Sequence, residues 1–230
     1  MIATHASREY DICVAFANLA GSAAGDLDVV LDTVVGECLR LLPVDGVELF
    51  LPGFSDHRYS AGSDAGPAAE CCRTGRGIAV ADLAEAGRAW PGYSARTSAL
   101  GYKAVSVLPL RTEAEAVGAA SLFTRGSTIL NARDRRLAQA LLDVAAVFLV
   151  RDRDLKKSER TTAQLQRALD SRVIIEQAKG VLATQSGVTV SIAFGVLRAF
   201  ARNTNQKLAD VASDVVNGVL RMEDFRVEKK

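Results

Sequence analysis

The segment SRVIIEQAKGVLATQSGVTVSIAFGVLRAFA, residues 171–201, contains the longest charge-free run of the chain. This run covers residues 180–197, with Lys179 directly before it and Arg198 directly after it. Its length raises the question of a membrane span, but hydroxyl, amide and glycine residues fill its centre at positions 184–191. We therefore expect two helices of a soluble bundle, joined by a turn, and no membrane segment.

Apolar residues at helical spacing predict three helices in this part of the chain. Gly187 is expected to end the first helix, and Thr189 can cap the second. Asn205 can cap the third helix, which is expected to end at Gly218. The predicted inward faces are Ile174, Ala178, Val181 and Leu182, then Ala193, Val196, Leu197, Phe200 and Ala201, and then Leu208, Val211, Ala212, Val215 and Val216.

Basic residues flank the apolar stripes of the first two predicted helices. Lys179 lies seven residues after Arg172, and Arg202 lies four residues after Arg198, so each pair shares a helix face. We expect small residues to let the two helices approach closely and bring these cationic edges together. Such a surface suits phosphate groups or base edges. The small residues are Ala178, Gly180, Ala193 and Gly195.

The segment before the bundle, residues 151–170, is rich in charge and contains no glycine or proline. It predicts one helix that enters the bundle. Four residues recur at heptad-compatible positions, which is typical of a two-stranded coiled coil. Two heptads are fewer than a coiled coil usually shows, so a solvated connecting helix is the alternative. The four residues are Leu155, Thr162, Leu165 and Leu169.

Residues 1–150 predict an α+β domain, with helices at both ends of an antiparallel sheet. Two helices are expected over about residues 12–42, and Asn131 can cap a long helix with an apolar face of Leu137, Leu141, Val144 and Phe148. Pro67 and Gly75 bound a short helix. Strand-like runs occupy residues 46–53, 78–83, 103–111 and 117–125, the last two forming a hairpin, and residues 57–62 can pair with the first.

Charge and cysteine usage separate the two parts of the chain and indicate its compartment. Residues 1–150 carry 13 basic and 17 acidic side chains, whereas residues 155–218 carry nine and five, so only the later part is expected to meet a polyanion. Charges within the first residues predict no signal peptide. Four cysteines without C-x-x-C spacing predict reduced thiols in the cytoplasm: Cys13, Cys38, Cys71 and Cys72.

The run PAAECCRTGRGIAVADLAEAGRAWPGYSARTSALGYKAVSVLPLRTEAEAVGAASLFT, residues 67–124, resembles the second half of GAF domains. The shared features are a short helix ending in Thr-Gly, an apolar strand followed by Asp-Leu, a Trp, a strand ending in Pro-Leu, and a Val-Gly-Ala-Ala strand. The resemblance covers roughly residues 8–150. It implies a sensor domain with an unidentified small-molecule ligand or none. The Asn-Lys-Phe-Asp-Glu signature of cyclic-nucleotide GAF domains is missing, so no cofactor is assigned.

Residues 168–216 are similar to ANTAR domains, which are three-helix RNA-binding modules of bacterial transcription antiterminators, often joined to GAF domains. The resemblance lies in Ser-Arg, Gln-Ala-Lys-Gly, Ala-Phe, Leu-Arg and a later Asn, Leu and Val-Ala. It implies RNA contact by Lys179, Gly180, Arg198 and the Asn205 turn. Ile192 departs from the family, which commonly has an acidic residue there. Nearby cations complete the predicted RNA-binding set: Arg172, Arg202 and Lys207.

The sequence thus predicts a cytoplasmic, dimeric, signal-responsive RNA-binding antitermination regulator whose targets are hairpins. Its predicted parts are a sensor domain (1–150), a connecting helix (151–170), the RNA-binding bundle (171–218) and a tail (219–230). Phe194 and Phe200 are interpreted as core residues of the bundle.

Two other functions stay open at this stage. Three small helices can also dock in a DNA major groove. A thiol enzyme of the GAF class would use Cys71 or Cys72. Neither His5 nor His57 is spaced as a metal ligand, so no metal site is expected.

Overall fold

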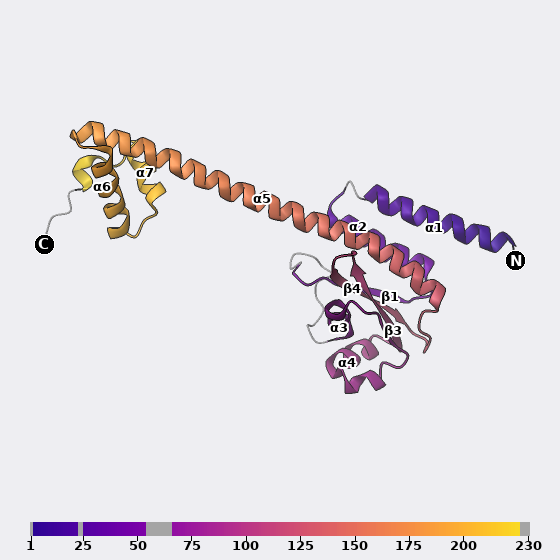
Figure 1. The fold of residues 1–230 in the computed structure, drawn as a ribbon. Helices are drawn as coiled ribbons and strands as arrows, with labels where there is room; N and C mark the ends of the chain where they lie inside the picture. The colour runs from indigo at the N-terminus through magenta and orange to yellow at the C-terminus, as the bar shows by residue number, and fades with distance from the viewer. Residues whose placement is uncertain (1, 23–24, 54–65, 226–230) are drawn as a thin grey trace. The chain divides into compact units, whose positions relative to one another are not determined.

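The computed structural model describes residues 2–22, 25–53 and 66–225 of the 230-residue chain. Two compact units divide it at Leu155 and Lys156, and one helix, α5, contributes to both. The elements, drawn in Figure 1, are α1 (Ile2–Ser22), α2 (Leu27–Leu41), β1 (Gly46–Phe50), α3 (Pro67–Thr74), β2 (Ile78–Val80), η1 (Glu85–Arg88), α4 (Pro91–Ala99), β3 (Ala104–Arg111), β4 (Ala116–Thr124), α5 (Ala132–Ser186), α6 (Val190–Asn203), α7 (Leu208–Val216) and η2 (Met222–Phe225).

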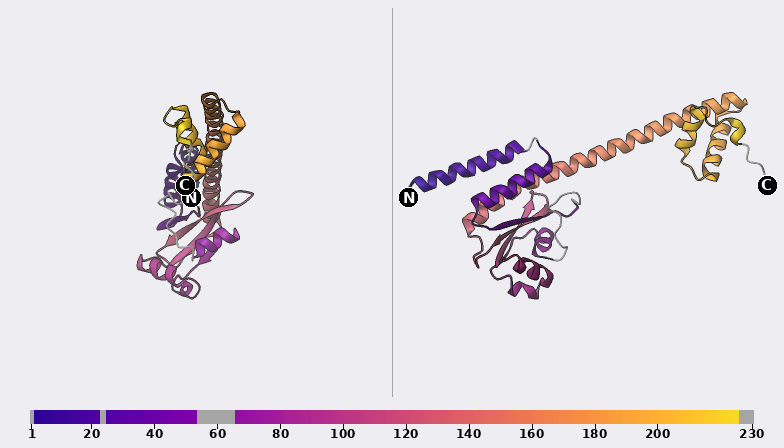
Figure 2. Two further views of the ribbon diagram at one scale, coloured as in Figure 1. Left: turned by 90° about the vertical axis from the view of Figure 1, so that its left-hand side faces the viewer. Right: turned by 180° about the vertical axis from the view of Figure 1, so that it is seen from behind.

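A four-stranded antiparallel sheet in the order β1-β4-β3-β2 organises the N-terminal unit. Figures 1 and 2 show α1, α2 and α5 on one face of this sheet and α3 and α4 on the other. Gly118 in β4 lies where β1 ends, and a Cβ added there would come within 2.7 Å of the Phe50 carbonyl oxygen. An antiparallel sheet with helices on both faces is the predicted α+β architecture, which is thus confirmed.

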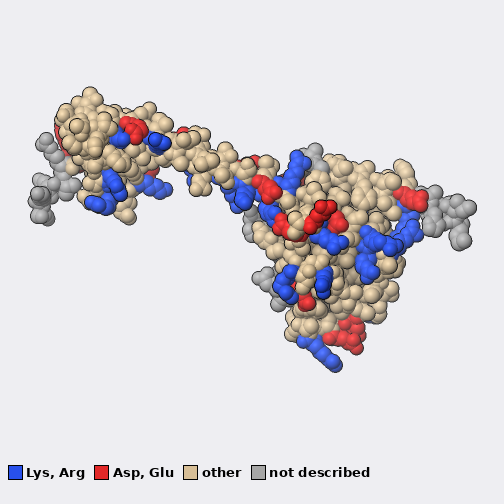
Figure 3. Space-filling model, viewed as in Figure 1, with Lys and Arg blue, Asp and Glu red and all other residues tan. Residues whose placement is uncertain are grey.

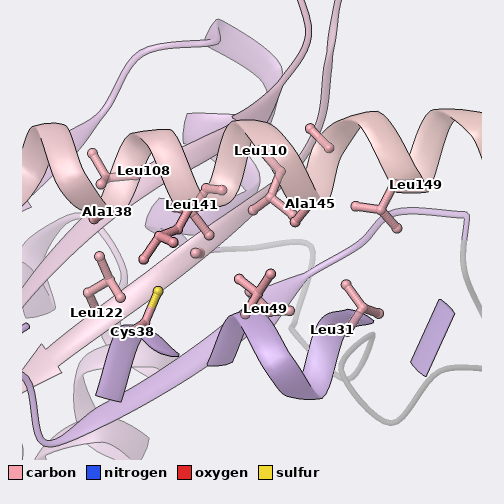
Figure 4. Packing of buried hydrophobic residues seen from close by; sticks show 14 of the residues in the cluster. Leu31, Cys38, Leu49, Leu108, Leu110, Leu122, Ala138, Leu141, Ala145 and Leu149 are labelled. Carbon is pink, nitrogen blue, oxygen red and sulfur yellow. The ribbon is translucent and has the colours of Figure 1, made fainter. Parts of the chain in front are cut away.

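The larger core lies between the sheet and the three helices α1, α2 and α5. In Figure 4, Leu31 and Cys38 of α2 point toward Leu141 and Leu149 of α5. Each fully buried leucine contributes about 1.5–3 kcal/mol relative to an exposed one, so this layer stabilises the start of α5. The opposite face of the sheet packs a smaller core on α3 and α4, which includes Cys71, Tyr93 and Phe123.

Local signals determine where several helices begin and end. Pro67 occupies the first turn of α3, and Gly75 ends that helix with a φ of 66°. The Asn131 Oδ1 accepts hydrogen bonds from the backbone N–H groups of Arg133 and Asp134, each at 2.9 Å, and so caps α5. These ends agree with the predictions.

Other predictions for the N-terminal unit need correction. Leu137, Val144 and Phe148 are only half-buried, and the fully buried face of α5 is shifted to Ala138, Leu141, Leu142, Ala145 and Leu149. The short helices η1 and α4 were not predicted, because their sequences carry no clear apolar period. The predicted strand at residues 57–62 lies outside the described residues.

The C-terminal unit is a bundle of the end of α5 with α6, α7 and η2. Its core is built around Ala178, Leu182, Ala193 and Leu197, all of which are fully buried. Gly187 has a φ of 65° and separates α5 from α6, while the Thr189 side chain caps α6 by accepting from the Ile192 N–H. The predicted turn and cap are confirmed.

The bundle extends further along the chain than the predicted boundary at residue 218. Phe225 of η2 is buried, and its ring centroid lies 4.7 Å from that of Phe200. Leu220 and Phe225 therefore pack on the core of this unit, although they lie in the predicted tail.

Among the described residues, no single helix is long and apolar enough to cross a membrane. The helices α5 and α6 together contain a stretch of that length and apolarity, but the chain bends by 111° between them.

Candidate nucleic-acid interface

Lys179 is the most constrained of the predicted RNA-contacting cations. Its Nζ donates to both carboxylate oxygens of Glu176 at 2.8 Å. The same ammonium lies 5.2 Å from the centroid of the Phe194 ring on α6, a cation–π geometry. The Lys179 side chain is only 17% exposed, whereas that of Glu176 is 59% exposed. The lysine stem is thus packed and its charge is held at the surface.

Phe194 corrects the sequence interpretation, because it does not belong to the bundle core. It is half-buried and lies outside the core cluster around Leu197. One face of α6 carries Phe194, Arg198 and Arg202 at successive four-residue steps. Both arginines are exposed. The Lys179 ammonium therefore meets the start of a row that combines an aromatic ring with two guanidinium groups.

The two helical glycines do not act as the predicted spacers between helices. A Cβ added to Gly180 or Gly195 would meet no atom within 4 Å. Close approach of α5 and α6 comes instead from Ala178 and Ala193, which are fully buried. Gly180 is exposed next to Lys179, so it leaves bare backbone beside the cation.

Asn205 does not cap α7 as predicted. It has a φ of 53°, a left-handed conformation that asparagine adopts more readily than most residues. The N-cap residue of α7 is Lys207, whose side chain makes no capping hydrogen bond. Both residues are exposed in the turn between α6 and α7, directly after Arg202.

Arg172 is exposed on α5, two turns before Lys179. The structure thus brings the Lys179 ammonium against Phe194 of α6, while Asn205 and Lys207 lie exposed in the turn that follows α6. In Figure 3 most of the visible face of this unit is uncharged, with a few separate basic patches and a smaller acidic patch. Sequence reasoning missed Phe194 and Glu176, although Glu176 lies three residues from Lys179, a spacing that signals an ion pair.

Cys71 and Cys72 of the N-terminal unit are poorly suited to nucleophilic chemistry. Burial raises the pKa of Cys71 to about 12, and the neighbouring Cys72 adds to this shift. Burial also raises the pKa of Cys72. Because the thiolate is the nucleophile, these raised pKa values disfavour the reactive form of both thiols near neutral pH. Among the described residues, no three His, Cys, Asp or Glu side chains are grouped as a metal site requires.

Family comparisons agree with this division of the chain. The GAF domain family matches residues 26–149, and the ANTAR domain family matches residues 163–216. The chain belongs to the GAF family and carries a C-terminal ANTAR domain. No curated protein matches this GAF–ANTAR chain. Both domain families are regulatory rather than catalytic.

Solved structures show the same fold for the GAF domain. The GAF domain of an Acinetobacter phosphoenolpyruvate-protein phosphotransferase has a TM-score of 0.52 at 10% identity and covers 64% of this chain and 95% of its own. The corresponding domain from Coxiella burnetii has a TM-score of 0.51 at 15% identity and covers 64% and 98%. These likenesses bear on the fold alone.

Proposed function

We propose that this GAF–ANTAR protein is a signal-responsive RNA-binding regulator that promotes antitermination. Its bundle binds a hairpin in a nascent transcript, and the bound hairpin prevents a terminator from forming. Acting on nascent transcripts places the protein in the cytoplasm. The GAF domain supplies the control, and α5 connects it to the bundle.

The observation that carries this proposal is the surface formed by Lys179, Phe194 and Arg198 on the bundle that the ANTAR family matches. We name these three residues, with Arg202, the α5–α6 surface. Cations bind phosphates, and this attraction supplies much of the affinity for nucleic acid. RNA recognition usually also needs an unpaired loop base stacked on an aromatic side chain or an arginine plane. The α5–α6 surface offers both types of contact.

Glu176 gives this surface a resting state. Its carboxylate accepts hydrogen bonds from the Lys179 ammonium at 2.8 Å. It thereby pairs with the cation that a phosphate group of RNA would otherwise bind. RNA binding therefore requires Lys179 to exchange or share this partner. Because Glu176 is largely exposed, the pair is worth no more than about 1 kcal/mol, so the exchange is inexpensive.

The proposal also includes a homodimer formed along α5. Leu155, Leu165 and Leu169 are 58%, 61% and 58% exposed in a single copy. They lie at heptad positions of a segment whose other side chains are also exposed, so a second α5 would cover the seam. Two ANTAR bundles in one dimer suit a target with paired hairpins.

Sequencing of the RNA that crosslinks to the full-length protein in cells tests the proposal. We expect enrichment of leader transcripts with hairpins before a terminator, and loss of this enrichment in the Lys179→Ala/Arg198→Ala double variant. An RNA profile identical in wild type and double variant would contradict it. Enrichment of duplex DNA instead would favour the rival reading of a DNA-binding regulator.

A further inference from the structure

A cavity of about 330 Å³ opens at the edge of the sheet in the GAF unit. Strand β2 pairs only with Val105, Ser106 and Val107 of β3. Beyond this pairing, Leu108, Pro109 and Arg111 of β3 line the cavity without a strand beside them on this side. Gln139 of α5 also lines it.

Pro109 interrupts the exposed edge of β3, so the cavity is poorly suited to an added strand. Pro109 has no N–H to offer, and its carbonyl oxygen accepts a hydrogen bond from Gln139 Nε2 at 2.9 Å. This bond ties α5 to β3 across the cavity. The space that remains is suited to a ligand.

Three arginines line the cavity, namely Arg111, Arg135 and Arg136. None of the residues that line it is acidic. Outside the lining, the Asp143 Oδ1 lies 3.8 Å from Arg111 Nε and accepts from Gln139 Nε2 at 2.6 Å. Within the described part of the chain, the structure gives no ion pair for Arg135 or Arg136. Three guanidinium groups around one cavity repel each other, and a bound anion would relieve that repulsion.

The floor of the cavity is apolar. Ile78 lies at its edge, while Val107, Leu108 and Leu130 are buried beneath it. Ligand cavities range over about 300–1,000 Å³, so this one lies at the small end. A ligand with an apolar body and one anionic group would match both the floor and the rim.

We propose that this cavity binds a small organic anion, either an organic phosphate or a carboxylate. Its charged group would lie between Arg111, Arg135 and Arg136. The ligand would bridge β3 and the first turns of α5, the helix that continues into the ANTAR bundle. This inference does not rest on RNA binding, because the ligand is titrated without RNA.

The test is isothermal titration calorimetry of the full-length protein with phenyl phosphate, benzoate and neutral phenol. We expect saturable binding of at least one anion, with at least about tenfold higher affinity than for phenol. The Arg135→Gln/Arg136→Gln variant should lose about tenfold in affinity. Arg111→Gln is a second variant on a different element and should weaken binding in the same direction.

Arg133→Gln is the matched control, because Arg133 is exposed in the same turn of α5 but does not line the cavity. It should leave the affinity within about twofold, since only a long-range charge is lost. All variants should keep the wild-type unfolding temperature. The proposal is overturned if neither anion binds saturably, or if Arg133→Gln weakens binding as much as the cavity variants do.

Discussion

The ammonium group of Lys179 on α5 lies 5.2 Å from the ring centroid of Phe194 on α6. This contact joins the two helices at the surface of the bundle, above the fully buried Ala178 and Ala193. It places a cation and an aromatic ring at the head of the row that continues to Arg198.

Lys179→Ala and Arg198→Ala should each weaken hairpin RNA binding by about tenfold and reduce the dependence of log affinity on log salt by about one unit. The reason is the loss of one phosphate contact in each case. Fluorescence anisotropy at several salt concentrations measures both quantities.

The matched control for these variants is Arg160→Ala, which removes one exposed cation from the connecting part of α5. Its affinity should stay close to that of the wild type. Equal losses in all three variants would mean that only the total charge matters and that the α5–α6 surface has no specific role.

Phe194→Leu should weaken binding to hairpins with unpaired loop bases by about 1–3 kcal/mol, because leucine packs similarly but cannot stack on a base. Binding to a fully paired RNA of the same length should change little. Thermal unfolding serves as the control, because Phe194 is only half-buried and lies outside the core cluster. A uniform loss on both RNAs would refute a stacking role.

Glu176→Gln should strengthen RNA binding by about two- to fivefold, because it frees the Lys179 ammonium and removes a negative charge beside the RNA. The gain should vanish in the Lys179→Ala background, since the two residues act through one contact. A double-mutant cycle of RNA affinities measures this coupling. Additive effects on RNA affinity would show that Glu176 and Lys179 act independently.

Gly180→Ala should raise stability and lower RNA affinity at the same time. Alanine stabilises an exposed helix interior by about 0.5–1 kcal/mol relative to glycine, and its Cβ meets no atom of this protein. A methyl group beside Lys179 would still obstruct close approach of an RNA backbone. Gly195→Ala, with equal space around it, is the reference for the stability gain. If the variant binds RNA as tightly as the wild type, Gly180 is not part of the RNA-binding surface.

Leu165→Glu/Leu169→Glu should convert the dimer to a monomer without unfolding either unit. Both leucines are largely exposed in one copy, so the charges enter water unless a second α5 covers them. Sedimentation equilibrium measures the change in mass. A wild type that is already monomeric at micromolar concentration would contradict the proposed seam.

Sequence reasoning succeeded where short-range chemistry determines structure. Asn131, Gly187 and Thr189 act on their own backbone neighbours, so their roles can be predicted from spacing alone. Errors arose where a residue depends on a partner from another helix. The position of Phe194 under Lys179 depends on how α5 and α6 pack, which periodicity alone does not determine.

Asn205 and Phe225 illustrate the same limit. Asparagine suits both a helix cap and a left-handed turn, and only the path from α6 to α7 decides between them. Phe225 follows a short stretch with no helical period, and its burial depends on the ring of Phe200.

The most direct test of the central claim is a competition between hairpin RNA and duplex DNA of equal length for the full-length protein. We predict that hairpin RNA displaces labelled RNA at concentrations at least about tenfold lower than duplex DNA does, and that Lys179→Ala/Arg198→Ala abolishes this preference. Equal competition by the two nucleic acids, or a preference for DNA, would contradict the account.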